Sequence, residues 1–434
     1  MITRARAPEP PAHRATTANL QAVYPFISDI GLGEQGPFIG RDLLGGGPFC
    51  FDPWVLYGAE VLTNPNLIVL GQVGRGKSTF VKTFVWRQMI FGRQAWILDP
   101  KGEYGPLAAA VGVEPVVLRP GGQVRLNPLD LGAPASPSRD DLLMVTRRQA
   151  DLVCSLGEST LGRVLTPAER TAVELAVRSA STTSRKPTLS DVVRLLLDPR
   201  EEAAAAVYTD RVSLAEDGRL VALELRRLVE GDLAGMFDGP TSSHVDLSGR
   251  LVVLDLSSVY MSPALALLMS CATGWMQSAL SRRDRVKRLV VIDEAWAILH
   301  DLAAARWLRS VFKLSRSFGV STLAVVHRLS DLKAAGAQGS VQQRLAQGLL
   351  ADSETRVAFG QPASEADLTS ELLSLSRTER DVIVHLPRGI ALWRVGGRSF
   401  LVEHVVGGIE APFVDTDFAM RDTGMTVDAG TPQS

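Results

Sequence analysis

The sequence contains few cysteines: only Cys50, Cys154 and Cys271 occur among its 434 residues. They stand far apart, none is part of a CxxC pair, and none has a histidine close by. A disulfide framework needs several paired cysteines, and a structural zinc site needs ligands in short-spaced pairs. Neither can organise this fold, and the sparse cysteines are typical of a reducing compartment, so we expect a cytoplasmic protein.

The sequence also lacks a long apolar run. The nearest approach is residues 263–280, which Ser270, Thr273, Gly274, Gln277 and Ser278 interrupt. A membrane-spanning helix needs about 20 predominantly apolar residues. We therefore expect no transmembrane segment, and we interpret residues 263–280 as a buried helix between two strands.

Neither sign of charge is in excess, with 46 basic and 47 acidic residues. This balance excludes a globally polybasic nucleic-acid binder and is typical of an ordinary globular protein. Residues 1–36 begin with a stretch rich in Pro, Ala, Thr and Arg that has no apolar core of signal-peptide length, so we expect a disordered lead-in and no secretion. Residues 409–434 are expected to form an acidic, disordered tail.

Short continuous apolar runs recur along the chain, with helical stretches between most of them. They occupy residues 66–70, 95–98, 115–118, 251–256, 289–292 and 322–326. Such runs are typical of fully buried parallel strands. The alternation predicts an α/β fold with a doubly wound, mostly parallel central sheet.

One interval breaks this alternation. Residues 140–235 carry apolar positions at helical spacing, which predicts an all-α insertion that divides the core into residues 37–139 and 236–408. Near the end of the core, Gly396 and Gly397 separate two strand-like segments, 391–395 and 399–406, as in a two-residue β-hairpin.

The segment Gly71–Ser78, GQVGRGKS, fits the phosphate-loop pattern GxxxxGK[ST]. A buried strand precedes it and a helix over about 77–91 is predicted to follow, which is the context that the pattern requires. The glycines let the backbone wrap a phosphate, so that main-chain amides and the helix N-terminus face it. The alternative is a glycine-rich turn without a ligand. We expect ATP to be held by Gly71, Gly74, Arg75, Gly76, Lys77, Ser78 and Thr79.

Individual roles follow from the chemistry of the side chains. Lys77 is expected to reach the β- and γ-phosphates and to act in catalysis, Ser78 to bind Mg²⁺, and Thr79 to contact the α-phosphate. The apolar strand 289–292 ends in Asp293 and Glu294. Asp293 is expected to bind Mg²⁺ through a water, and Glu294 to activate the attacking water. Alternatively, the two carboxylates cap the next helix.

Further candidates follow other strands. Asp99 and Glu103, in the segment DPKGEY, are expected near the nucleotide at the carboxyl edge of the sheet. Alternatively, the segment is a purely structural loop, because Asp99-Pro100 and Lys101-Gly102 are ordinary turn formers. His327 could sense the γ-phosphate, or it is a structural histidine. Arg316 is the candidate arginine finger and Arg356 a second one, with surface ion pairs as the alternative for both. The basic run from Arg282 to Arg288 could contact nucleic acid or be a solvated surface.

Taken in order, the motifs LIVLGQVGRGKST, WILDPKGEY, RLNPLD, FDGP, LVVIDEAWAIL and SRSFGVSTLAVVH resemble the TraC family of conjugation and type IV secretion ATPases, in the HerA/FtsK branch of P-loop motors. The resemblance spans residues 40–406. It implies a RecA-like ATPase that uses ATP and Mg²⁺. It also implies a homo-oligomer, either a hexamer or a dimer, at the inner face of the cell membrane, where it serves a secretion or conjugation apparatus.

Two departures from the family pattern limit what carries over. The match covers the ATPase domain and not the family's large N-terminal domain, and His327 stands where the family commonly has a glutamine. Three functions therefore compete. The first is an ATP-hydrolysing motor of a conjugation or type IV secretion-like system, powering apparatus assembly or DNA or protein transfer. The others are a DNA-pumping translocase, with DNA as a direct partner, and a nucleotide-binding assembly scaffold that does not hydrolyse ATP.

Overall fold

The computed structural model describes residues 31–130, 138–184, 186–243, 245–246, 249–260, 286–295, 319–327 and 348–414, with positions 305, 308–309, 312, 315, 330 and 344. The helix expected at 263–280, Arg316 and most of the basic run lie outside these residues. Within them, no helix is both long and apolar enough to cross a membrane.

The described strands form one sheet of 11 in the order β2-β1-β11-β10-β9-β3-β8-β7-β4-β6-β5. From β9 to β5 all neighbours are parallel, whereas β10, β11, β1 and β2 extend the sheet with antiparallel pairs. The prediction of a mostly parallel α/β sheet is confirmed. The strand bounds are Phe38–Asp42 (β1), Pro48–Cys50 (β2), Leu67–Leu70 (β3), Gln94–Asp99 (β4), Val116–Val117 (β5), Leu251–Asp255 (β6), Arg288–Ile292 (β7), Val320–Val326 (β8), Thr355–Phe359 (β9), Ile390–Val395 (β10) and Arg398–His404 (β11).

The antiparallel extension includes one strand, β1, that the apolar pattern did not predict. This strand is short and carries a glycine, Gly40, where a Cβ atom would lie 1.9 Å from the carbonyl oxygen of Glu403 in β11. Only glycine lets the two backbones approach this closely. The same glycine interrupts the apolar run that would have indicated a strand.

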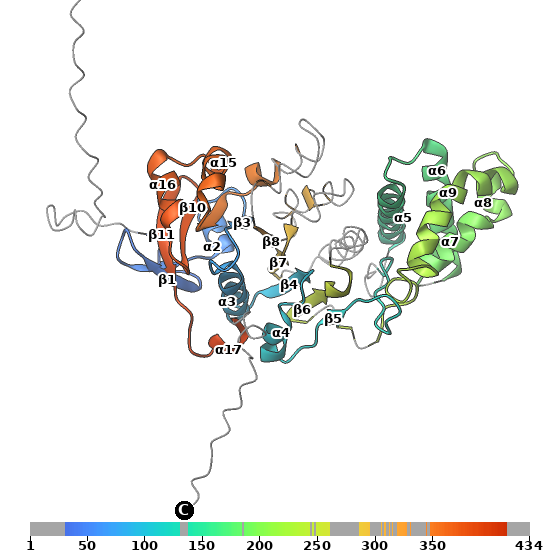
Figure 1. The fold of residues 1–434 in the computed structure, drawn as a ribbon. Coiled ribbons are helices and arrows are strands. Elements are labelled where there is room, and N and C mark those ends of the chain that lie inside the picture. Colours follow the sequence, from blue (N-terminus) through green and yellow to red (C-terminus); the bar gives the residue numbers. More distant parts are fainter. Residues whose placement is uncertain are drawn as a thin grey trace, which may run out of the picture.

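Helices cover both faces of the sheet (Figure 1). Alternate residues of the central strands belong to two separate hydrophobic clusters, one on each face of the sheet. In β3, Leu67 and Val69 pack in the cluster that contains α2, α3 and α4, whereas Ile68 and Leu70 pack in the cluster on the other face. The helix bounds are Pro53–Gly58 (α2), Lys77–Ile90 (α3), Gly105–Val111 (α4), Arg139–Leu161 (α5), Pro167–Thr183 (α6), Leu189–Leu197 (α7), Glu201–Ala205 (α8), Arg211–Val229 (α9), Ala363–Leu373 (α15), Arg377–His385 (α16) and Ala411–Val414 (α17), with a 3₁₀ turn at Ser257–Val259 (η1).

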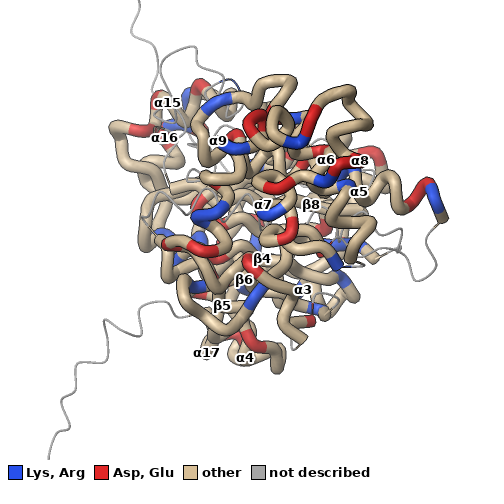
Figure 2. The backbone as a smooth tube through the Cα atoms, turned by 90° about the vertical axis from the view of Figure 1, so that its right-hand side faces the viewer, with Lys and Arg blue, Asp and Glu red and all other residues tan. Residues whose placement is uncertain are grey.

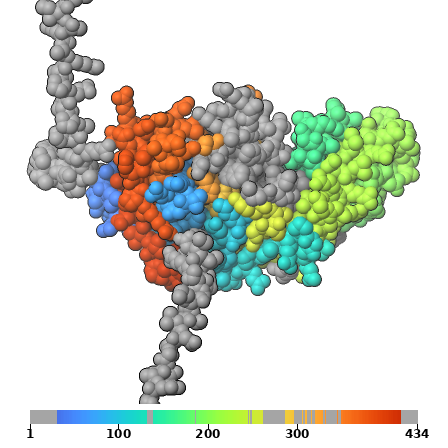
Figure 3. Space-filling view, in the orientation of Figure 1, coloured from blue at the N-terminus to red at the C-terminus, as the bar shows by residue number. Residues whose placement is uncertain are grey.

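Helices α5 to α9 pack together and project beyond the β5 edge of the sheet (Figures 1 and 3). Three of them begin at capping boxes, formed by Ser138 with Asp141, Thr166 with Glu169, and Thr188 with Asp191. These caps satisfy amides that have no partner inside the helix, which sets where each helix starts. Acidic and basic residues are interspersed over this region (Figure 2), and ion pairs such as Arg163–Glu169 join them.

The chain beyond residue 408 is ordered further than expected. Helix α17 lies against α3 and α4, and its Phe413 packs on Trp86 with ring centroids 5.1 Å apart. The expectation of a disordered tail from residue 409 is therefore wrong as far as residue 414, because the apolar Phe413 and Val414 are buried. Residues 415–434 lie outside the described residues.

A buried ion pair fastens this C-terminal segment to α3, the helix that follows the phosphate loop. Arg87 donates to both carboxylate oxygens of Glu410 and to the carbonyl oxygens of Phe38 and Val405. The side chains of Arg87 and Glu410 are only 13% and 5% exposed. The guanidinium of Arg87 thus links α3 to β1 and to the segment that follows β11.

We expect Arg87→Ala to lower the free energy of unfolding by about 3 kcal/mol, because removing one partner of a buried pair leaves an uncompensated charge. Arg41→Ala is the matched control: Arg41 also pairs with a glutamate, Glu403, but is 66% exposed, so its loss should cost less than about 1 kcal/mol. Urea denaturation measures both. Equal losses in the two variants would contradict the anchoring role of Arg87.

Candidate nucleotide-binding site

The phosphate loop connects the buried strand β3 to helix α3 at the carboxyl edge of the sheet. Gly76, which caps α3, has φ of +106°, a left-handed conformation that favours glycine. Gly71 passes so close to β9 that a Cβ atom there would lie 2.6 Å from the Cβ of Phe359. The loop glycines are therefore required by the backbone path, and the first turn of α3 begins directly at Lys77.

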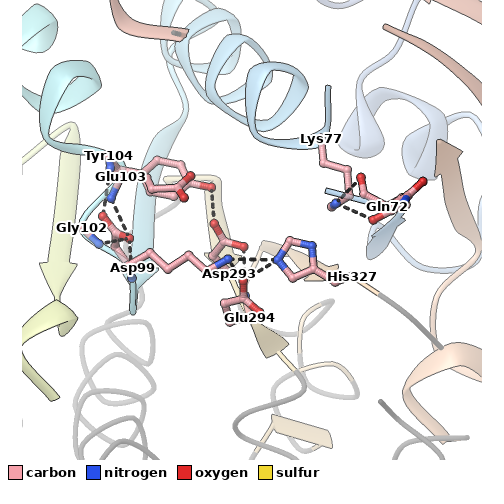
Figure 4. A network of polar contacts seen from close by, with 11 residues as sticks. Gln72, Lys77, Asp99, Gly102, Glu103, Tyr104, Asp293, Glu294 and His327 are labelled. Atoms are coloured by element: carbon pink, nitrogen blue, oxygen red, sulfur yellow. Dashed lines mark hydrogen bonds and ion pairs between the residues drawn. The ribbon is translucent and has the colours of Figure 1, made fainter. Parts of the chain in front are cut away.

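Lys77 folds back onto its own loop. Its Nζ donates to the carbonyl oxygen of Gly71 and, at 3.0 Å, to that of Gln72 (Figure 4). The residue is only 4% exposed. Burial lowers the pKa of Lys77 to about 8, although nearby Asp293 partly opposes the shift. Binding a phosphate would exchange two neutral acceptors for an anionic one.

A pocket of about 190 Å³ opens over this loop. It brings together residues from the phosphate loop, the segment after β4, the end of β7 and the end of β8. The lining residues are Val73, Gly74, Gly76, Lys77, Ser78, Thr79, Lys101, Glu103, Asp293, His327 and Arg388. Most of the residues proposed from the sequence thus meet at one place, although the first of them, Gly74, and the last, His327, are far apart in the sequence.

Asp293 lies at the end of β7 and is only 4% exposed. Its carboxylate accepts hydrogen bonds from the Tyr104 hydroxyl at 3.2 Å and from the Glu294 amide at 2.9 Å. Burial, together with the neighbouring Glu294 carboxylate, raises the pKa of Asp293 to about 6. A cation would relieve this penalty, and Ser78, whose side chain carries a hydroxyl, lines the same pocket. These oxygen donors fit Mg²⁺, which commonly uses one or two protein ligands together with phosphate oxygens and waters.

Glu294 stands in a restrained position next to Asp293. Its φ is +51°, which is uncommon for a residue with a side chain, and it is 1% exposed. The carboxylate forms an ion pair with Lys101 and a hydrogen bond with Nε2 of His327 (Figure 4). Burial by itself would raise the pKa of Glu294, but the contacts with His327 and Lys101 outweigh it and lower the pKa to about 2. The carboxylate is therefore ionised throughout the neutral range.

The two acidic residues of the DPKGEY segment, Asp99 and Glu103, differ in their position relative to the pocket. The carboxylate of Asp99 accepts hydrogen bonds from the amides of Lys101, Gly102, Glu103 and Tyr104, at 2.8 to 3.2 Å. It shapes its own loop and is not among the pocket-lining residues, so the structure does not support direct nucleotide contact by Asp99. Glu103, by contrast, lines the pocket.

Of the two arginine candidates, only Arg356 belongs to the described residues, and it is not among the pocket-lining residues. Arg316 lies outside the described residues. Arg356 donates to the carbonyl oxygens of Leu350, Ser353 and Leu373, so it holds the end of α15 within its own subunit and is not positioned as a finger. In the basic run, Arg288 is 4% exposed, donates to Gln94 and lies over the Trp96 ring, which places it in the protein interior and not on a nucleic-acid surface.

Lys101, Tyr104 and Arg388 belong to the site although no sequence pattern assigns them to it. Lys101 fits an ordinary turn, Tyr104 ends the DPKGEY segment, and no motif contains Arg388. Arg388 reaches the pocket because its neighbour Gly389 donates to the carbonyl oxygen of Arg75 at 3.0 Å, which ties the start of β10 to the phosphate loop. The one sequence feature that points to Lys101 as a site residue is its position two residues after Asp99, at the end of β4.

The fold matches solved structures of P-loop proteins. VirB4 of Thermoanaerobacter pseudethanolicus superposes with a TM-score of 0.68 and 22% identity, over 88% of this chain and 100% of that chain. The plasmid coupling protein TrwB in complex with ADP and Mg²⁺ gives a TM-score of 0.58 and 17% identity, over 92% of this chain and 95% of that chain. No protein-family model matches the chain, and no curated protein sequence does.

VirB4 and TrwB belong to the group of proteins that the sequence motifs resemble, so that prediction is confirmed at the level of the fold. The fold is that of a RecA-like P-loop NTPase with a mostly parallel central sheet. At these identities the likeness concerns the fold. The chemistry of the pocket has to be argued from its own residues.

Proposed function

We propose that this chain binds ATP with Mg²⁺ and hydrolyses it, as the motor of a conjugation or type IV secretion-like system. The observation that carries the proposal is the pocket in which Lys77, Ser78 and Thr79 at the start of α3 face Asp293 at the end of β7. A phosphate-binding lysine and helix N-terminus opposite a buried carboxylate are the parts that phosphoryl transfer to water requires.

Each residue has a distinct role in this proposal. Lys77 would leave the carbonyl oxygens of its own loop for the β- and γ-phosphates. Ser78 and Asp293 would hold Mg²⁺, with Asp293 acting through a bound water, and the ion would neutralise charge between the phosphates. Glu294, held at the same strand end, would orient and polarise the attacking water. Gly71, Gly74, Arg75 and Gly76 would provide the backbone cradle, and Thr79 would contact the α-phosphate.

The cellular setting is proposed from the neighbours. TrwB is described as a bacterial conjugative coupling protein, and one of its structures contains ADP and Mg²⁺. By analogy, we place this chain in a homo-oligomer, a hexamer or a dimer, that works in the cytoplasm at the inner face of the cell membrane and supplies a secretion or conjugation apparatus. Arg316 stays the proposed arginine finger between subunits, and His327 the proposed sensor.

We expect hydrolysis to depend on assembly. The specific ATPase activity should rise as protein concentration increases and reach a plateau when the oligomer is complete, because an arginine from a neighbouring subunit would complete the site. Phosphate release, measured over a range of protein concentrations beside light scattering, tests this. Activity that is high and independent of concentration would contradict it.

The same assay separates the competing functions. A DNA-pumping translocase should be stimulated by double-stranded DNA in a salt-dependent manner. A scaffold should bind ATP at every concentration without releasing phosphate. Hydrolysis that needs assembly but not DNA supports the proposed secretion or conjugation motor.

A further inference from the structure

Two pocket-lining side chains, Lys101 and His327, converge on Glu294, which is not itself among the lining residues. Lys101, after β4, forms an ion pair with Glu294, after β7, and its Nζ lies 3.1 Å from Nε2 of His327, after β8. His327 in turn contacts the same Glu294 oxygen, Oε1. The Glu294 side chain is 1% exposed, whereas Lys101 is 26% and His327 21% exposed, so the carboxylate lies beneath its two partners.

This arrangement occupies one oxygen of the carboxylate that is proposed to activate water. A carboxylate polarises water by accepting its proton in a hydrogen bond, and Oε1 already accepts from the lysine. For Oε1 to accept a hydrogen bond from the attacking water, Lys101 has to move.

The γ-phosphate is a ligand that could move it. Lys101 lines the same pocket as Lys77, Ser78 and Thr79, and its backbone is fixed by the loop that the Asp99 carboxylate organises. A lysine side chain has four rotatable methylenes, so Nζ can change partner without movement of that loop. A terminal phosphate carries more negative charge than one carboxylate and accepts several hydrogen bonds.

We propose that Lys101 is a γ-phosphate-binding residue that pairs with Glu294 in the absence of nucleotide and transfers to the γ-phosphate when ATP binds, which frees Glu294 for the attacking water. This inference rests on the proposed ATPase function. ADP, which lacks the γ-phosphate, leaves the pair intact. Premature activation of water in an empty or ADP-bound site is thereby avoided.

The first test compares the affinities for ATPγS and ADP, both with Mg²⁺, by isothermal titration. Lys101→Met keeps an unbranched side chain that is one atom shorter and removes the charge. We expect it to reduce the preference for ATPγS over ADP by about 10-fold, the value of one charge-assisted hydrogen bond, while ADP affinity stays unchanged. Lys101→Arg should restore part of the preference. Lys186→Met, at an exposed lysine before α7, is the matched control and should change neither affinity.

A double-mutant cycle tests the exchange of partners. If ATP breaks the pair, Glu294→Gln should tighten ATPγS binding, and Lys101→Met should cost more in the Glu294→Gln background than in the wild type. No such coupling is expected for ADP. Equal coupling for the two nucleotides, or none for ATPγS, would overturn the proposal, since a purely structural ion pair behaves in that way.

Failure of this inference is distinguishable from failure of the proposed function. If the wild type binds neither nucleotide, or Lys77→Ala binds both as well as the wild type, the ATPase proposal itself is wrong. If the wild type binds both and Lys77→Ala does not, but Lys101→Met retains the full preference for ATPγS, only the role of Lys101 is refuted.

Discussion

Glutamine in place of Glu294 is expected to lower the kcat of ATP hydrolysis by about 10² to 10⁴-fold, the usual contribution of a general base, while ATP binding persists. The change keeps the size of the side chain and removes the charge that would polarise water. Because Glu294 lies at the end of β7 beside the proposed magnesium-binding Asp293, its loss affects the chemical step and not the phosphate cradle. Steady-state phosphate release and nucleotide titration measure the two quantities separately.

The control for this prediction is the same substitution at Glu202, an exposed glutamate in α8. Glu202→Gln should retain the wild-type kcat and the wild-type affinity. Hydrolysis at the wild-type rate in Glu294→Gln would remove the water-activating role from this residue. A loss of ATP binding in Glu294→Gln would instead indicate that the carboxylate supports the fold of the pocket.

Alanine in place of Lys77 is expected to weaken ATP binding by about 100-fold or more and to abolish measurable hydrolysis. The ammonium group would donate to the β- and γ-phosphates, and each charge-assisted hydrogen bond contributes about 1.5–3 kcal/mol. In the structure, the ammonium group of Lys77 donates hydrogen bonds to the carbonyl oxygens of Gly71 and Gln72. The variant therefore also loses two contacts that order the empty loop.

Thermal unfolding with and without MgATP checks the prediction for Lys77 independently of turnover. ATP should raise the unfolding temperature of the wild type and leave that of Lys77→Ala unchanged, because only a bound ligand stabilises the native state. Lys186→Ala, at an exposed lysine, should respond to ATP like the wild type. Equal stabilisation of Lys77→Ala would show that the phosphates bind elsewhere.

Several parts of the fold could be predicted because local sequence dictates them. Buried parallel strands such as β3 and β7 consist of continuous apolar residues, and the glycine pattern before Lys77 fits one backbone path. Strand β1 could not be predicted, since Gly40 is needed only because Glu403, more than 300 positions later, passes so close. The ordered end at α17 likewise depends on Arg87, which finds its partner Glu410 only in the folded chain.

The sequence by itself determined the phosphate loop and the acidic pair Asp293 and Glu294. The loop follows one buried strand and the two carboxylates follow a second one, and the carboxyl ends of parallel strands lie at the same edge of the sheet. Tertiary structure decided what those groups contact. It assigned the Asp99 carboxylate to its own loop and Arg356 to carbonyl oxygens at the end of α15, and it placed Lys101 and His327 on Glu294. Partners of a side chain depend on distances across the sheet, and local spacing carries no information about them.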